Sequence, residues 1–218
     1  MTDQSALADW IDRVFGPRKY YLISLVIVLY ALLPFFMAFE GRKPEVRELV
    51  VLATMIALAT AGRAAFFMTP SFKPIIAIVI ISAIAFGAEA GFLVGSMTML
   101  VSNFLFGQGP WTPWQMFAMG FIGFLSGILY RLRILPTKRL QLSVYGFLVT
   151  FMIYGGIMNP AALFMSVYQF SWSGLLAIYI SGVPVDLVHA SSTFLFLWIG
   201  AKPLLEKLQR IKVKYGLL

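Results

Sequence analysis

The chain has 218 residues, of which 60% are hydrophobic and 12% are charged, and its mean hydropathy is +0.86. A soluble domain averages about 45–50% apolar and about 25% charged residues, so the composition indicates an integral membrane protein and excludes a sizeable soluble domain. The net charge of +8 comes from basic residues at the ends of apolar segments, which indicates orientation in a lipid bilayer and argues against nucleic-acid binding.

The N-terminal part, residues 1–46, combines two kinds of segment. Residues 3–16 place apolar side chains on one side of a helix, which predicts an amphipathic helix at the membrane interface. Residues 20–39 are long and apolar enough to span a bilayer, with a kink expected at Pro34. Two topologies remain open, because counting spans puts the N-terminus outside whereas Arg18 and Lys19 favour the inside.

The segment 48–68 is the next predicted span, and small residues recur along it. Alanine occurs every fourth residue at Ala53, Ala57 and Ala61, which gives the helix one smooth face. Such a face is used either for ordinary packing inside a bundle or for docking another protein. Arg63, near the far end of this span, is expected to snorkel or to pair.

A rigid turn is predicted at 107–113, with one glycine-rich span before it and another after it. Pairs of small residues four apart, such as Gly91 with Gly95 and Gly123 with Gly127, let helix backbones approach closely in a membrane. Ahead of them, 69–74 is a predicted turn, and 75–86 is short for a span, so it is expected to be tilted or sheltered by protein.

Orientation follows from two strongly basic segments, 131–139 and 202–214, which the positive-inside rule places in the cytoplasm. Residues 140–158 then span outward. We expect residues 159–182 to form an uncharged outer loop with a surface helix, and Pro184 to begin the final span.

Eight residues near the predicted outer face are candidates for substrate binding, and most of them have a structural alternative; Gln108 is the one least explained by packing. Asp186 and His189 either bond each other at a helix start or line a pocket, and Asn159 is either a helix cap or a donor facing Asp186. The tryptophans are either interfacial anchors or pocket residues. The candidates are Asn103, Gln108, Trp111, Trp114, Tyr154, Asn159, Asp186 and His189.

Signatures of catalysis and of an energy source are missing from the sequence. It contains no phosphate-binding G-x-x-x-x-G-K-[ST] loop, no G-x-S-x-G and no H-E-x-x-H motif, so we expect neither an enzyme nor an ATPase. The lack of cysteine and the single histidine make a metal site unfavourable, and no cofactor is expected. Acidic residues inside the spans are too rare for a typical proton-coupled transporter.

Three stretches resemble one family of membrane proteins: ALATAGRAAFF at 57–67, FLVGSMTMLVSNFLFGQGPWTPWQM at 92–116 and PVDLVHASSTFLF at 184–196. They resemble the substrate-binding S components of energy-coupling factor (ECF) vitamin transporters, and most of all the cobalamin-type S components. The resemblance implies an all-α, polytopic membrane bundle whose six-helix core occupies 47–218, with an extra hydrophobic helix before it. In that family the vitamin pocket faces the outside of the prokaryotic cytoplasmic membrane.

The resemblance also implies partners. The alanine face would dock on a membrane coupling subunit that is driven by two ATPases, and the matching residues are Ala53, Ala57 and Ala61. The expected function is therefore capture of a vitamin, cobalamin first, for an ECF-type importer. The alternatives are an S component for another vitamin or a queuosine-precursor-like metabolite, or a self-contained secondary transporter.

Overall fold

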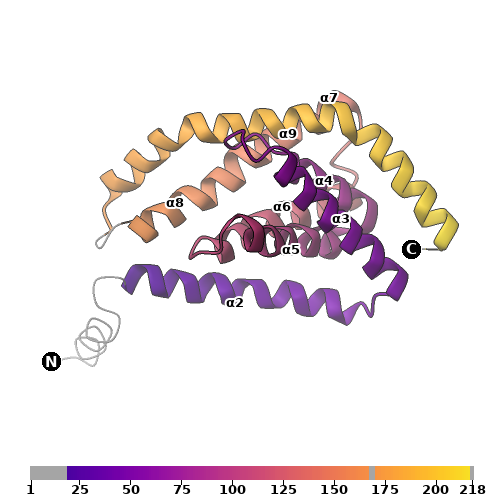
Figure 1. The fold of residues 1–218 in the computed structure, drawn as a ribbon, viewed down its shortest axis with the longest axis horizontal. Helices are drawn as coiled ribbons and strands as arrows, with labels where there is room; N and C mark the ends of the chain where they lie inside the picture. Colours follow the sequence, from indigo (N-terminus) through magenta and orange to yellow (C-terminus); the bar gives the residue numbers. More distant parts are fainter. Residues whose placement is uncertain (1–18, 167–169, 217–218) are drawn as a thin grey trace.

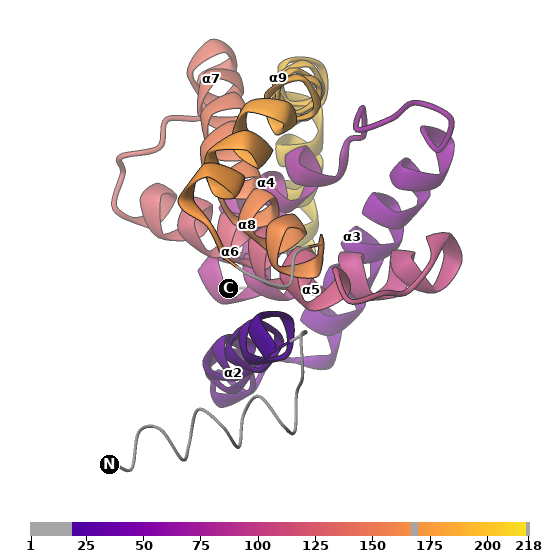
Figure 2. The ribbon, with the colours of Figure 1, turned by 90° about the vertical axis from the view of Figure 1, so that its left-hand side faces the viewer.

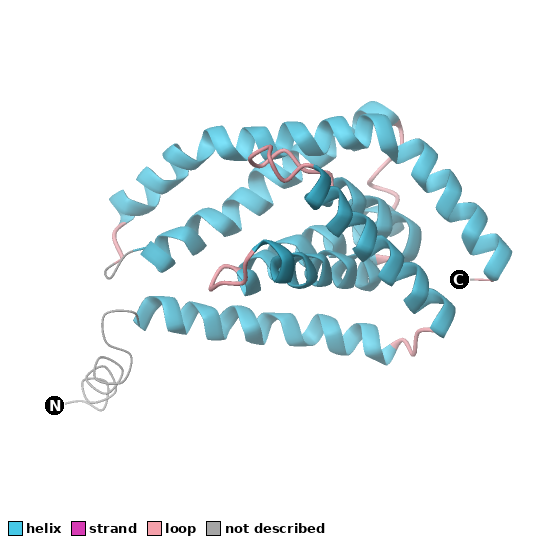
Figure 3. Ribbon diagram, viewed as in Figure 1, coloured by secondary structure: helices cyan, strands magenta, loops and turns pink. Residues whose placement is uncertain are grey.

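The fold was analysed in a computed structural model that describes residues 19–166 and 170–216. Within these ranges every regular element is a helix, which confirms the predicted all-α membrane bundle (Figure 3). The amphipathic helix predicted at 3–16 lies outside the described residues. The elements are α2 (Lys19–Gly41), α3 (Val46–Ala65), α4 (Ile75–Phe86), α5 (Ala88–Phe106), α6 (Thr112–Arg131), α7 (Arg139–Val149), η2 (Thr150–Tyr154), α8 (Gly155–Ser166) and α9 (Trp172–Tyr215).

Length and apolar composition allow six of the described helical segments to cross a membrane, if the continuous run from α7 to α8 is taken as one. The exception is α4, which has 12 residues, all of them buried. A helix that is apolar on every side belongs in the interior of a bundle. The expectation that 75–86 is sheltered by protein is therefore confirmed, and α4 is the central helix of the fold.

The two ends of the bundle differ in charge, as the sequence predicted. Figure 1 places the α5–α6 turn, the end of α8 and the start of α9 at one end of the molecule. The basic connection between α6 and α7 and the basic end of α9 lie at the other end. The start of α2 lies at the same end as the α5–α6 turn, so the arrangement favours the topology with seven passes.

Glycine packing joins α5 to α6, as the pairs of small residues predicted. A Cβ atom added at Gly91 would lie 2.8 Å from the carbonyl oxygen of Gly123, and one added at Gly123 would overlap the Gly91 backbone. These two helices therefore touch backbone to backbone, where no side chain can be inserted without moving a helix.

Helix α2 packs on this pair of helices. The Phe35 ring stacks on Phe92 at 4.1 Å between centroids and meets the edge of Phe124 at 4.9 Å. Figure 2 shows α2 on the α5 side of the molecule, away from α7 and α9. Its opposite face exposes apolar side chains such as Ile27, as expected of a helix that faces lipid.

One predicted element is wrong: residues 159–182 are not an outer loop. Helix α8 continues through Pro160 to Ser166, and α9 has already begun at Trp172. A proline inside a helix removes the hydrogen bond to the carbonyl four residues earlier. Here that carbonyl belongs to Gly156, and the Tyr179 hydroxyl donates a hydrogen bond to it over 2.9 Å, so a neighbouring helix replaces the missing donor.

The start of the final span was misplaced for the same reason. Pro184 lies 12 residues inside α9, which runs for 44 residues and also contains Pro203. Asp186 is consequently in the middle of a long helix, and the expected placement in a first helical turn is wrong. Its carboxylate is stabilised by a side chain of another helix instead, as described below.

Candidate functional site

Two hollows in the described part of the chain are large enough to consider, and their walls differ in chemistry. The larger, about 510 Å³, lies beside α7 and α9, and its wall is apolar except for the Ser191 hydroxyl. The smaller, about 140 Å³, brings charged, amide, hydroxyl and aromatic groups together. Its wall consists of Arg63, Ser71, Lys73, Ile75, Met99, Gln115, Met119, Tyr154 and His189. Convergent polar groups in an otherwise apolar bundle are typical of a ligand site, so the smaller cavity is the candidate.

Arg63 enters the cavity wall from the last turn of α3 and is held by α5. One terminal guanidinium nitrogen donates to Ser102 Oγ at 2.5 Å and to Asn103 Oδ1 at 2.7 Å. The guanidinium also lies 5.1 Å from the centre of the Phe106 ring. These contacts fix the direction of a long, flexible side chain that would otherwise snorkel to the membrane surface.

Asn103 connects this arginine to α6. Its side chain is fully buried, and its amide nitrogen donates to Thr112 Oγ1 and to Gln115 Oε1, each at 2.9 Å. All the polar atoms of the Asn103 side chain are therefore used inside the protein. It orients Arg63 and Gln115, both of which face the cavity, and does not itself line it.

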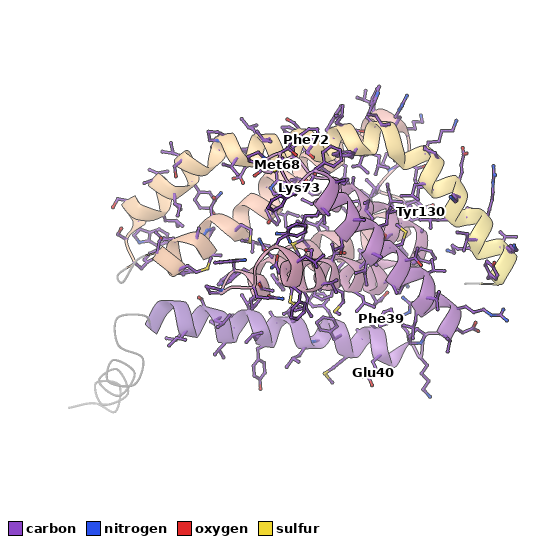
Figure 4. All side chains as sticks on the ribbon, in the orientation of Figure 1. Phe39, Glu40, Met68, Phe72, Lys73 and Tyr130 are labelled. Carbon is purple, nitrogen blue, oxygen red and sulfur yellow. The ribbon has the colours of Figure 1, made fainter. Side chains whose placement is uncertain are left out.

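The connection between α3 and α4 closes another side of the cavity with Ser71 and Lys73. Figure 4 labels Phe72 and Lys73 in this connection, next to α9. Ser192 of α9 donates its hydroxyl to the Lys73 carbonyl at 2.9 Å, and the Lys73 ammonium donates to the Thr69 carbonyl at 3.0 Å. Ser71 has a positive φ of 57°, which is uncommon for a residue with a side chain.

Lys73 is in an environment that disfavours its charge. Partial burial, and secondarily the nearby positive charge of Arg63, lower the pKa of Lys73 below the ordinary lysine value. Loss of hydration and repulsion by a like charge both act against the ammonium form.

Tyr154 and His189 form the aromatic wall. Their rings meet edge to face, with centroids 4.9 Å apart and an angle of 78° between the planes. Tyr154 ends the π-helical segment η2, whose wider turn shifts the side chains that follow relative to a regular α-helix. Both residues were candidates from the sequence, and both line the cavity.

Asn159 and Asp186 bond each other instead of facing the cavity. The Asn159 amide nitrogen donates to Asp186 Oδ2 at 2.8 Å, which ties α8 to α9. Gly155 gives the carboxylate room, because a Cβ atom there would lie 2.6 Å from Asp186 Oδ2. Neither residue is part of the cavity wall.

The three other candidates belong to the α5–α6 turn and its surroundings. Gln108 is exposed; its amide nitrogen donates to the Leu100 carbonyl, and its amide oxygen accepts from Thr112. Trp111 lies against Gly109 and is 39% exposed, and Trp114 lies beside Phe164 of α8. None of the three lines the cavity.

Sequence reasoning did not select the charged half of the site. The candidates omitted Arg63, Ser71, Lys73 and Gln115, although a turn was predicted at 69–74. A usable signal was present: Arg63 has no acidic residue within four positions in the sequence, so it cannot be neutralised on its own helix.

The alanine face of α3 is directed away from the bundle. Ala53, Ala57 and Ala61 are exposed, whereas Leu52 and Met55 on the opposite side of the helix are buried. The alanines are therefore not used for packing inside the described part of this chain.

A family model described as "ECF-type riboflavin transporter, S component" matches residues 43–210. The matched segment begins after α2 and includes every residue of the cavity wall. No curated protein and no solved structure matched the chain.

Proposed function

Because the chain belongs to the ECF-type riboflavin transporter S-component family, we propose that its substrate is a flavin-type vitamin and that the polar cavity is the binding site. The protein captures the vitamin at the outer end of the bundle. It delivers the vitamin together with a membrane coupling subunit and two ATPase subunits, which supply the energy that this chain has no motif to obtain. On this proposal α2, which precedes the matched segment, is an addition to a six-helix core.

The mixed chemistry of the cavity is the observation that carries this proposal. Riboflavin combines a flat aromatic ring system, carbonyl groups and a polyol chain. The Tyr154 and His189 rings offer apolar faces, while Gln115 and Arg63 offer N–H donors suited to ligand oxygens. Asn103 orients both donors, and the Asn159–Asp186 pair supports the neighbouring α8–α9 wall.

Binding requires the cavity to widen. Its volume of about 140 Å³ is below the roughly 300–1,000 Å³ that small-molecule sites usually occupy. The α3–α4 connection is the wall best suited to move, because it is irregular and contacts side chains of α9, through the bond from Ser192 and the packing of Phe72 on Phe196. Cobalamin, the vitamin expected from the sequence, is much larger, and the outer loop expected at 159–182 is replaced by the end of α8 and the start of α9. We therefore place riboflavin ahead of cobalamin.

We place the docking surface for the coupling subunit on the exposed alanine face of α3. Small side chains allow close approach of another helix in a membrane, and Ala53, Ala57 and Ala61 are left exposed by the described residues of this chain. Binding and docking thus use opposite sides of α3, since Arg63 is held by α5 on the inner side.

Vitamin binding and docking on the coupling subunit can be tested separately, with the full chain in lipid nanodiscs and in cells. Riboflavin added to the purified protein is expected to lose its fluorescence on binding. An A57W/A61W double variant is expected to retain binding and to lose uptake in cells that contain the coupling subunit and ATPases. Val26→Trp, on the exposed face of α2, is the matched control and should change neither.

Three results would contradict the proposal. Absence of riboflavin binding removes the substrate assignment, and undiminished uptake by the A57W/A61W variant removes the docking assignment. Uptake into liposomes by the purified chain alone would instead indicate a secondary transporter.

A further inference from the structure

The cavity wall contains two cations and no acid. Arg63 and Lys73 both line it, and the remaining wall residues are uncharged amides, hydroxyls, aromatics and aliphatics, with His189 as the one other titratable base. Half-buried charges of like sign repel each other and lose hydration, so this arrangement is unfavourable until a counter-charge arrives.

No acidic side chain of the described residues supplies that counter-charge. The ion pairs recorded within 19–166 and 170–216 join Arg42 to Glu48 at 2.7 Å and Arg42 to Glu89 at 3.6 Å. Both lie around the α2–α3 connection, at the opposite end of α3 from Arg63. Asp186, on the helix that also carries His189, bonds Asn159 and is not part of the wall.

Both cations retain donors for a ligand. The two hydrogen bonds of Arg63 leave from the same terminal nitrogen, whereas a guanidinium carries five N–H groups. The Lys73 ammonium donates one bond, to the Thr69 carbonyl, and has two further protons. The internal contacts of Arg63 and Lys73 therefore position them without exhausting them.

Resting on the proposed function, we propose that the substrate this cavity selects is anionic: a phosphate monoester of a flavin, in preference to the uncharged vitamin. Arg63 and Lys73 bind the phosphate oxygens, and the aromatic wall contacts the ring system. A phosphate monoester carries a charge of about −1.5 to −2 at neutral pH, which matches two cations better than a single carboxylate does. Charge-assisted bonds from arginine and lysine to phosphate are among the stronger hydrogen bonds in proteins.

The proposal is tested by comparing riboflavin with its phosphate monoester, flavin mononucleotide, in fluorescence titrations of the full chain in nanodiscs. We expect the monoester to bind at least about tenfold more tightly at low salt, since two charge-assisted contacts are gained. Its affinity should weaken as salt is raised, whereas that of riboflavin should not. Inorganic phosphate should compete with the monoester and leave riboflavin binding unchanged.

A substitution at Lys73 tests whether the preference for the monoester arises in the cavity. Lys73→Gln should reduce the affinity for the monoester about tenfold more than the affinity for riboflavin, and Lys73→Arg should retain most of the preference. Lys207→Gln, an exposed lysine on the basic end of α9, is the charge-matched control and should behave as the parent protein. Lys73 is the better position to alter, because Arg63 also holds α3 to α5 and its loss threatens the fold.

The outcomes distinguish this inference from the proposed function. Equal or tighter binding of riboflavin overturns the anionic preference and leaves the flavin assignment standing. A preference for the monoester that survives Lys73→Gln overturns the role of the cavity cations. Failure of both flavins to bind rejects the proposed function together with this inference.

Discussion

The two long helical hairpins of the bundle are held together by opposite means. In α5–α6 the backbones touch at glycines, and at these positions no side chain lies between the helices that could rearrange. In α8–α9 two side-chain hydrogen bonds, Asn159 to Asp186 and Tyr179 to the Gly156 carbonyl, join helices that both contain prolines. Backbone packing is lost only when the helices separate, whereas single polar contacts can open one at a time.

This difference bears on the cavity, because its wall takes residues from both sides. Met99 and Gln115 come from the glycine-packed pair, while Tyr154 and His189 come from η2 and α9. The α3–α4 connection belongs to the second side through its bond from Ser192. We therefore expect the α5–α6 side to stay in place, and the α9 side to move, when the cavity widens for a substrate.

The largest effect is expected from a methyl group at the glycine contact. Gly123→Ala places a Cβ atom against the Gly91 backbone, which cannot yield as a flexible side chain would. We expect a loss of roughly 1–3 kcal/mol of stability, measured as a lower midpoint of thermal unfolding in detergent. Gly200→Ala is the control: nothing lies within 4 Å of its added Cβ atom, so the midpoint should stay nearly constant. Equal midpoints for the two variants would contradict the rigid α5–α6 contact.

A smaller effect is expected from the amide that bonds Asp186. Asn159→Ala leaves a half-buried carboxylate without its hydrogen-bond donor, and should cost about 1 kcal/mol. The double variant N159A/D186N should be less destabilised than the sum of the two single variants, because the contact can be lost only once. Additive losses in the unfolding midpoint would show that the pair does not act as a unit.

The hydroxyl that replaces the backbone donor missing at Pro160 should contribute still less to stability. Tyr179→Phe removes the donor to the Gly156 carbonyl and is expected to cost about 0.6 kcal/mol, the average for a hydrogen bond between membrane helices. Hydrogen exchange should become faster in α8 and stay unchanged in α6. Tyr130→Phe, on an exposed tyrosine at the end of α6, is the control (Figure 4). Unchanged exchange in α8 would mean that the helix does not need this bond.

The same contrast explains which features the sequence predicted. The spans, the glycine contacts and the buried α4 follow from local periodicity and composition, so they were readable along the chain. Residues 159–182 were misread because Asn159-Pro160 and Pro184 are local signals for helix ends. The donor that keeps α8 helical at Pro160, Tyr179, is 23 residues away from Gly156 in the sequence. The meeting of Arg63 with Lys73 was equally hidden, because it depends on how the α3–α4 connection folds back.

The smallest expected effect concerns pH and the α3–α4 connection. The pKa of Lys73 is lowered by burial first and by Arg63 second, so the folded protein binds the Lys73 proton less tightly than the unfolded chain does. Between the lowered value and the ordinary lysine value of 10.5, the unfolded chain holds more protons, and stability therefore rises with pH in that window. Lys73→Gln should remove this rise from the pH dependence of the unfolding midpoint, and Lys207→Gln should not. A rise that persists without Lys73 would mean that the connection bears no electrostatic strain, and the movable side of the cavity would then have to be sought along α9 alone.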